Sequence, residues 1–279
     1  MLVSTSLLVL AFSTWRLVSS ICHDESVRRI SDLGVIDLIP GDRFGYAMAA
    51  IGDLDNDGIG DVAIGSPGSG AIYIVFLLTD GAIKHHVRIE SQDANETEFG
   101  RAIGAVGDLD GDLIPEIAVS GYTGNNTGVV NILFMQRDGT VKSQQRLSET
   151  EGGLDIPPYH GEDGDRFGES LSGLQDLDKD GVPDLAVGAS FDDNIGKHSG
   201  AVYILYLHRN GTVKSYAKIS GTEGGFDRGE GGVEGGVPVP LLHQWDMFGS
   251  SVANVGDMDG DDINDLVIGA PGDGMNKLK

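Results

Sequence analysis

The dipeptide Phe-Gly occurs four times in this chain, and each copy is followed, nine residues after its Phe, by an aspartate that opens an acidic loop. The copies begin at Phe44, Phe99, Phe167 and Phe248, and the loops begin at Asp53, Asp108, Asp176 and Asp257. The distance from Phe to Asp is constant, whereas the distance between successive copies grows along the chain. This combination predicts equivalent structural units joined by connectors of different length.

Each unit has the residue pattern of short β-strands. A short apolar run such as 185–188 follows the acidic loop, and a run rich in β-branched and aromatic residues such as 201–207 comes next. The turn pairs Asp80-Gly81, Asp138-Gly139 and Asn210-Gly211 then precede a polar, alternating strand. Four strands in meander order are typical of a β-propeller blade, and we expect the third to be buried and the fourth to lie at the solvent edge.

The composition is that of a globular but strongly acidic chain. Hydrophobic residues make up 40% and charged residues 22% of its 279 residues, which is enough apolar material for a core. The formal net charge of −24 opposes contact with nucleic-acid phosphates and with anionic membrane surfaces, so we expect no nucleic-acid partner. Cys22 is the only cysteine, so neither an intrachain disulfide nor a cluster of thiolate zinc ligands is available.

Each acidic loop carries carboxylates at its first, third, fifth and ninth positions. Carboxylates this close together repel one another unless a cation lies among them. A backbone carbonyl at the seventh position brings the set towards the ~6 to 8 oxygens that Ca²⁺ prefers, whereas Mg²⁺ demands a more rigid octahedron. The predicted ligands of up to four Ca²⁺ ions are Asp53, Asp55, Asp57, Ile59 and Asp61; Asp108, Asp110, Asp112, Ile114 and Glu116; Asp176, Asp178, Asp180, Val182 and Asp184; and Asp257, Asp259, Asp261, Ile263 and Asp265.

Two other interpretations of these loops exist. Asp and Gly favour hairpin turns without any metal, but four loops in the same register favour a cation. An EF-hand shares positions 1, 3, 5 and 7 but ends with a carboxylate at position 12 and is flanked by helices. Position 12 is apolar here and lies in a predicted strand, which rules out a helix-pair calcium switch. The residues at position 12 are Ile64, Val119, Val187 and Ile268.

The sixth loop position predicts a difference among the four sites. Gly58 and Gly181 adopt a left-handed turn without cost, and Asp262 tolerates it at modest cost. Leu113 occupies this position in the second loop, where a bulky side chain makes the conformation costly. The closing carboxylate of that loop, Glu116, is also one methylene longer than an aspartate. We therefore expect the second site to bind Ca²⁺ most weakly.

The Phe-Gly pairs, the DxDxDGxxD loops and the endings Gly-Ser-Pro67, Gly-Ala-Ser190 and Gly-Ala-Pro271 resemble those of FG-GAP repeat proteins, including the N-terminal β-propeller of integrin α subunits. The resemblance covers the chain from about Val27 onward. It implies an all-β fold, a β-propeller of four-stranded FG-GAP blades with calcium in some of them. In integrins such propellers have about seven blades and bind partner subunits and ligands outside the cell.

The units divide the chain into predicted segments. The apolar stretch at residues 1–12 is too short to span a bilayer, and the small residues at 18–20 suit a cleavage site, which predicts a signal peptide at 1–20 and a secreted, extracellular product. The remainder, 21–279, is the expected propeller region. Its predicted parts are blades at 44–90, 99–148 and 167–220, a partial blade at 248–279, and an outer closing strand at 27–31. Three complete blades do not close an ordinary ring, so we expect an incomplete propeller from a truncated chain.

The sequence contains no nucleophile elbow, zinc-protease motif or phosphate-binding loop, so we do not expect an enzyme. The favoured function is a calcium-binding module for adhesion to protein or glycan ligands. The alternative is the non-catalytic propeller of an extracellular hydrolase whose catalytic domain is missing from this chain. Sequons at Asn95, Asn125 and Asn210 agree with a secreted glycoprotein.

The meander also predicts where a ligand binds. Connections between the first and second strands and between the third and fourth emerge on one side, and the remaining connections emerge on the other. The calcium loops are connections of the first kind, so we expect the ligand on the opposite face, where loop variation does not disturb the metal sites. The segments expected on that face are 121–128, 149–165, 190–200 and 221–246.

Overall fold

The computed structural model describes residues 38–124, 127–156, 164–224, 233–234, 237–238 and 242–272. The predicted signal peptide, the predicted outer strand at 27–31 and the sequon residue Asn125 lie outside the described residues. Within them, the chain contains no α-helix, and its one helical turn is a 3-10 turn at Pro67–Ser69. The all-β expectation is therefore confirmed.

The strands follow one another along the chain in the order that the sequence pattern predicts. The first sheet contains β1 (Met48–Gly52), β2 (Asp61–Ser66), β3 (Ala71–Leu77) and β4 (Ile83–Glu90). The second contains β5 (Glu96–Thr97), β6 (Ile103–Gly107), β7 (Glu116–Thr123), β8 (Thr127–Met135) and β9 (Val141–Leu147). The third contains β10 (Phe167–Gly173), β11 (Leu185–Ala189), β12 (Ala201–Leu207) and β13 (Val213–Ile219). The remaining strands are β14 (Val233–Glu234), β15 (Val237–Pro238), β16 (Ser251–Gly256) and β17 (Asp265–Gly269).

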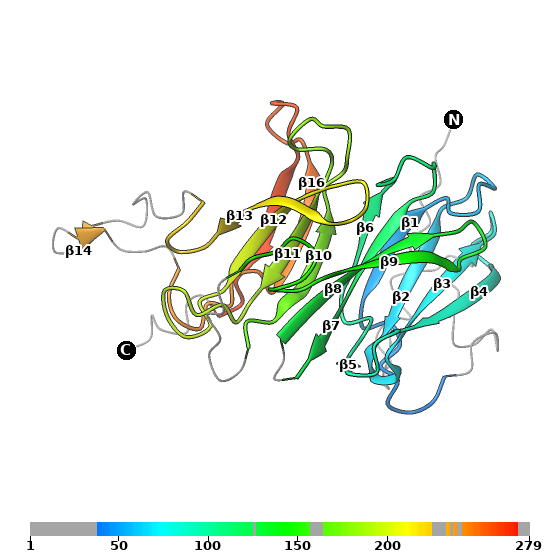
Figure 1. Ribbon diagram of the computed structural model, residues 1–279, viewed down its shortest axis with the longest axis horizontal. Helices are drawn as coiled ribbons and strands as arrows, with labels where there is room; N and C mark the ends of the chain where they lie inside the picture. Colours follow the sequence, from blue (N-terminus) through cyan, green and yellow to red (C-terminus); the bar gives the residue numbers. More distant parts are fainter. Residues whose placement is uncertain are drawn as a thin grey trace, which may run out of the picture.

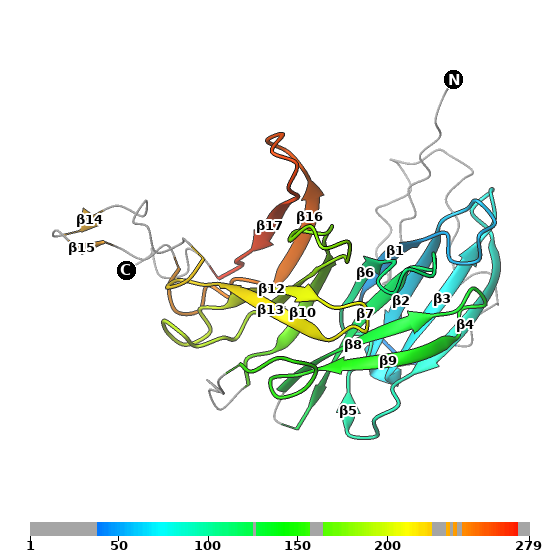
Figure 2. The same ribbon diagram turned by 45° about the horizontal axis from the view of Figure 1, so that its top comes forward.

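Each of the first three sheets is an antiparallel meander, in the strand orders β1-β2-β3-β4, β6-β7-β8-β9 and β10-β11-β12-β13. The short strand β5, which the sequence pattern did not predict, pairs with the far end of β7. Strands β16 and β17 form a two-stranded sheet. Figure 2 shows the sheets following one another in an arc, from the blue and cyan sheet through the green and yellow sheets to the orange and red pair. Four-stranded antiparallel sheets arranged side by side in this way are the blades of a β-propeller.

Burial follows strand position in the sheet, as expected. Six of the seven residues of β3 are buried, and β12 is similarly buried. The fourth strands β4 and β13 consist mostly of exposed and half-buried residues and contain no continuous apolar run. The third strands therefore provide the core of each blade, and the fourth strands form its solvent edge.

Three of the four Phe residues of the Phe-Gly pairs fill seams between neighbouring sheets. Phe99 is buried with Ile72 and Ile74 of the first sheet. Phe167 occupies the equivalent place against the second sheet, and Phe248 packs with Ala186 and Val202 of the third. Because these three residues contribute to the seam with the preceding sheet, they stabilise the contact between blades.

The Gly of each pair allows the backbones of two sheets to approach closely. A Cβ added to Gly65 would lie 2.0 Å from the carbonyl oxygen of Gly100, and one added to Gly188 would lie 2.0 Å from that of Gly249. In the seam between the second and third sheets, Ser120 takes the place that Gly65 and Gly188 occupy in the other two seams. Each seam therefore requires a small residue at the end of the second strand, which explains why apolar runs such as 185–188 end in glycine.

A left-handed residue precedes every Phe-Gly pair, and it has φ between 53° and 57° in all four units. In three units its carbonyl accepts a hydrogen bond from the residue three positions later, closing a turn whose third residue is the glycine at positive φ. These left-handed residues are Arg43, Glu98, Arg166 and Met247. The repeated turn brings the chain sharply into the first strand of each blade.

Candidate metal centres at one end of the blades

The four acidic loops lie at one end of the sheets, which we call the loop end. They are the β1–β2, β6–β7, β10–β11 and β16–β17 connections, and Figure 1 shows them at the top of the view. The Phe-Gly turns lie at the other end, which we call the Phe-Gly end. The structure therefore collects all four candidate metal loops on one face, as the meander predicts.

Backbone amides hold each loop in a folded form through its first and fifth carboxylates. Asp53 accepts hydrogen bonds from the amides of Asp57 (3.0 Å) and Gly58 (2.8 Å). Asp57 Oδ1 in turn accepts the amide of Ile59 at 3.0 Å. The fifth carboxylate accepts the amide of the seventh residue in all four loops, at 2.8 to 3.0 Å. The loops therefore keep their carboxylates on one side through local hydrogen bonds.

The ninth carboxylate is buried in the three complete blades. Asp61 accepts the amides of Leu54 (3.0 Å) and Leu77 (3.1 Å), which attaches the loop to the end of the third strand. Burial raises the pKa of Glu116 to about 7 and that of Asp184 to about 6, against backbone hydrogen bonds that act in the other direction. The other carboxylates of each loop raise both pKa values further, so the buried charges lack sufficient positive charge nearby.

The structure brings three carboxylates of each loop close enough to share one ion. In every group, one potential ligand atom per residue lies within 4.8 Å of the others. The groups are Asp53, Asp55 and Asp57; Asp108, Asp110 and Glu116; Asp176, Asp178 and Asp184; and Asp257, Asp259 and Asp265. Asp61 in the first loop and Asp112, Asp180 and Asp261 in the others lie outside these groups.

Two buried carboxylate oxygens agree with a cation at these groups. Asp55 Oδ1 and Glu116 Oε1 are shielded from solvent and have no hydrogen-bond partner. Glu116 itself is fully buried and belongs to the second group. An anionic oxygen without a partner is costly in the interior, and a divalent ion bound by hard oxygen ligands would satisfy it. The donor set therefore fits calcium.

The backbone of the loops has the expected left-handed turn at position 6. The φ angles there are 87° at Gly58, 66° at Leu113, 84° at Gly181 and 66° at Asp262. Leu113 adopts this conformation with 77% of its surface exposed, so burial of its side chain does not compensate for the strain. The seventh residues, Ile59, Ile114, Val182 and Ile263, are seen to donate their amides, and their role as carbonyl ligands remains a prediction.

Three lysines bind the loops, and the sequence interpretation missed them. Lys84 Nζ lies 2.7 Å from both Asp55 Oδ2 and Asp57 Oδ2. Lys142 bridges the third and fifth carboxylates of the second loop at 3.0 Å, and Lys214 those of the third loop at 2.6 and 2.7 Å. These contacts lower the pKa values of Asp57 and Asp180. A sequence signal existed, since each lysine stands four residues after the turn residue Asp80, Asp138 or Asn210.

The Phe-Gly end carries a row of ion pairs that links three sheets. Arg43 bonds Glu98 at 2.8 Å, and Glu98 also accepts from Arg101 at 2.7 Å. Arg101 then reaches Glu169 of the third sheet at 2.8 Å. Tyr122 donates to the same glutamate at 2.6 Å. We call these residues the Arg101 row, and its carboxylates have cationic partners within the chain.

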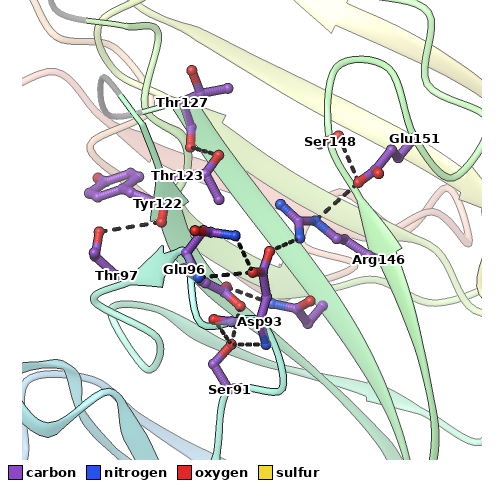
Figure 3. Close-up of polar contacts among 12 residues, drawn as sticks. Ser91, Asp93, Glu96, Thr97, Tyr122, Thr123, Thr127, Arg146, Ser148 and Glu151 are labelled. Carbon is purple, nitrogen blue, oxygen red and sulfur yellow. Dashed lines mark hydrogen bonds and ion pairs between the residues drawn. The ribbon is translucent and has the colours of Figure 1, made fainter.

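A second polar network surrounds Glu96 at the same end. Glu96 is buried, which raises its pKa, and its carboxylate accepts from Asn131 and Ser91. Figure 3 shows the guanidinium of Arg146 nearby, between the carboxylates of Asp93 and Glu151. The neighbouring sequon residue Asn95 is exposed.

Two exposed aromatic side chains outside the acidic loops pack against neighbouring rings. His85 is exposed on β4 and stacks on Phe76, with the two ring centres 4.1 Å apart. Trp245 is 40% exposed and packs edge-on against His198. No helix among the residues the structure describes is long and apolar enough to cross a membrane.

Comparison with known protein families identifies FG-GAP repeats at residues 44–75, 167–205 and 248–277. Similar proteins include integrin alpha-2 of Mus musculus, 30% identical over 238 residues that cover 82% of this chain and 17% of the mouse protein. Integrin alpha-5 of Xenopus laevis is 27% identical over 243 residues, which cover 82% of this chain and 20% of that protein. Integrin alpha-4 of Xenopus laevis is 29% identical over 163 residues, which cover 55% of this chain and 15% of that protein. The chain therefore spans one fifth or less of the length of these relatives.

Proposed function

We propose that this chain, an FG-GAP repeat protein with integrin alpha subunits among its relatives, is an extracellular binding module whose blades are stabilised by calcium. The observation that carries the proposal is that three carboxylates of every one of the four loops have ligand atoms within 4.8 Å of one another. A single acidic hairpin would need no ion. Four such groups at one end of the sheets concentrate negative charge that a divalent cation neutralises.

The first, third, fifth and ninth carboxylates would hold the ion, together with the carbonyl of the seventh residue. When bound, calcium would supply positive charge to carboxylates that are otherwise short of it. The unpartnered oxygens of Asp55 and Glu116 support this assignment. The flexible coordination of Ca²⁺ suits loops that differ at position 6 and in the length of the closing carboxylate better than the strict octahedron of Mg²⁺ does.

The proposed ligand face is the Phe-Gly end, and the proposed ligand is an extracellular protein or a glycan. Connectors between blades differ in length at this end, whereas the four acidic loops at the loop end are all nine residues long. The connector 190–200 is described in the structure, and residues 193–196 at its tip are partly accessible to solvent. Variation in these connectors would set specificity without changing the calcium loops.

Calcium titration tests the metal part of the proposal. Asp57→Asn and Asp180→Asn are expected to weaken calcium binding measured by isothermal titration calorimetry and to reduce the calcium-induced rise in Tm. Asp138→Asn is the matched control, because it removes the same charge at a turn where the third blade carries Asn210. If the parent chain released no heat with calcium and its Tm did not change, the metal assignment would be wrong.

A binding screen tests the ligand face. The chain is applied to an array of glycans and to a panel of purified extracellular proteins in millimolar calcium. Any ligand found is expected to be lost when 194–197 is replaced by Gly-Ser, while the calcium-induced rise in Tm is retained. Binding that survives this replacement, or that is lost in Asp138→Asn, would place the ligand elsewhere.

A further inference from the structure

We infer that Lys84, Lys142 and Lys214 are counter-ions built into the chain, which compete with calcium and thereby set the affinity of the first three loops. The inference rests on the proposed function, because it concerns the regulation of the same sites. Each lysine belongs to the fourth strand of its blade, in β4, β9 or β13, and each reaches the loop of its own blade. The same contact is therefore present three times in three different sheets.

The lysine contact is equivalent in all three blades. Each ammonium group bonds Oδ2 of the third and of the fifth carboxylate, at 2.6 to 3.0 Å. The lysine side chains are 36 to 48% exposed, so each ammonium can leave the loop for solvent without disturbing buried residues. A mobile cation attached to the edge strand thus occupies the loop in the absence of a divalent ion.

Competition follows from the hydrogen bonds of the fifth carboxylate. Asp57 uses Oδ1 for the amide of Ile59 and Oδ2 for Lys84. Asp112 and Asp180 have the same two partners in their own loops. To bind a divalent ion, this carboxylate must share or give up the oxygen that the ammonium holds. The two cations also repel each other at such short range.

The lysines do not neutralise the loops completely, so a place for a second cation remains. Each loop has four carboxylates and one bridging lysine. At the second loop, the buried Glu116 keeps Oε1 without a partner although Lys142 bridges Asp110 and Asp112. This oxygen is an observation independent of the acidic cluster itself, and it indicates where cation binding is still unsatisfied.

The fourth loop provides the internal comparison. Among the residues the structure describes, no lysine bonds Asp259 or Asp261. The backbone bonds of this loop match those of the others, since Asp261 accepts the amide of Ile263 at 2.8 Å. Within the described part of the chain, the fourth loop therefore has carboxylates at the same positions and no bridging ammonium.

The test replaces the lysines with methionine, which keeps the apolar stem and removes the charge. Lys84→Met, Lys142→Met, Lys214→Met and the triple variant are titrated with CaCl₂ by calorimetry at low ionic strength. Each single variant is expected to bind one calcium roughly two- to tenfold more tightly. This is the change expected when calcium no longer has to displace an ammonium from one or two exposed ion pairs. In EDTA the same variants are expected to melt at a lower temperature than the parent, because they lack the resident cation.

Lys179→Met is the matched control. Lys179 is exposed in the third loop, and the described structure gives it no ion pair, so its replacement removes the same charge without removing a bridge. It is expected to leave the melting temperature in EDTA unchanged and to alter calcium affinity less than Lys214→Met does. Equal effects of Lys179→Met and Lys214→Met would mean that calcium affinity depends on the net charge near the loop and does not depend on the lysine bridge.

The outcomes separate this inference from the proposed function. A parent chain that binds no calcium overturns both. A parent chain that binds calcium, with unchanged or weaker affinity in the lysine variants, overturns the competition alone. Should the triple variant fail to fold, Lys84→Arg serves beside Lys84→Met, since it retains the charge with a different geometry and is expected to bind calcium more weakly than Lys84→Met does.

Discussion

The two ends of the blades balance their charged groups differently. At the Phe-Gly end, Glu98 and Glu169 are paired with arginines of neighbouring sheets. At the loop end of each complete blade, one lysine bridges two of the four loop carboxylates. The comparison indicates that the chain itself supplies the cations between blades at one end and leaves an excess of carboxylates at the other.

The largest expected effect on stability comes from the close backbone contact at the Phe-Gly end, and we expect it to be independent of calcium. Gly188→Ala places a Cβ 2.0 Å from the carbonyl oxygen of Gly249 and forces the third and fourth sheets apart. We expect a loss of about 3 kcal/mol in the free energy of unfolding, as for severe overpacking. Urea unfolding in EDTA and in calcium should give the same loss.

The control for this change is Gly60→Ala, since an added Cβ there meets nothing within 4 Å. Its effect is expected to stay within about 0.5 kcal/mol. A loss for Gly188→Ala that calcium abolishes would contradict the independence of the two ends.

The second prediction concerns the Arg101 row. Arg101→Met leaves Glu169 without its strongest partner, and the two side chains are only 12% and 16% exposed. We expect the free energy of unfolding to fall by about 2 kcal/mol, as for breaking a largely buried ion pair. Arg43→Met, which removes a 40% exposed partner of Glu98, should cost less than about 1 kcal/mol. Equal losses in the two variants would show that burial does not decide the strength of this row.

The third prediction uses pH to probe the Phe-Gly end. Burial, and then the charges of Asp192 and Glu149, raise the pKa of Asp165 to about 7. The native state therefore keeps a proton that the unfolded chain loses above about pH 4, so this group makes the protein less stable as pH rises from about 4 to about 7. Asp165→Asn should remove that loss, worth about 1 to 2 kcal/mol at pH 7 after allowance for solvent screening.

Chemical denaturation of parent and variant at several pH values measures this effect. The stability difference between Asp165→Asn and the parent should grow between pH 4 and pH 7 and stay constant above about pH 8. Asp155→Asn, at an exposed aspartate, is the control and should show no such growth. A difference that shrinks with rising pH would reverse the sign of the argument.

The smallest expected effect distinguishes one acidic loop from another. Leu113→Gly removes a left-handed leucine at the turn of the second loop and should stabilise the chain by about 0.5 to 1 kcal/mol. It should also strengthen the second calcium site, which we predict to be the weakest. Leu78→Gly, at an exposed leucine without positive φ, is expected to destabilise by a similar amount. Thermal melting with and without calcium compares the two.

Repetition made most of the fold predictable. The predicted run 201–207 coincides with β12, and every acidic loop joins a first strand to a second. Strand β5 was missed because Glu96 and Thr97 have no alternating apolar pattern. Their pairing with β7 depends on how the connector lies against the second sheet.

The cations were less predictable than the carboxylates. The acidic residues of a loop are neighbours in sequence, so spacing alone places them together. Lys84 lies 29 residues from Asp55, and Arg101 lies 68 residues from Glu169. Only the meander and the seams between sheets bring such pairs into contact, which is why the sequence interpretation found the anionic groups and missed their partners.

The seams between blades have a consequence for the order of the units. Each described seam uses the same pieces, a phenylalanine and a glycine on one side and a small residue on the other. At these positions the seam between the first and second sheets is closely similar to the seam between the third and fourth, so these pieces alone do not distinguish one neighbouring unit from another. The succession of blades is therefore set by covalent connectivity together with contacts that belong to one seam, such as the pair of Arg101 and Glu169.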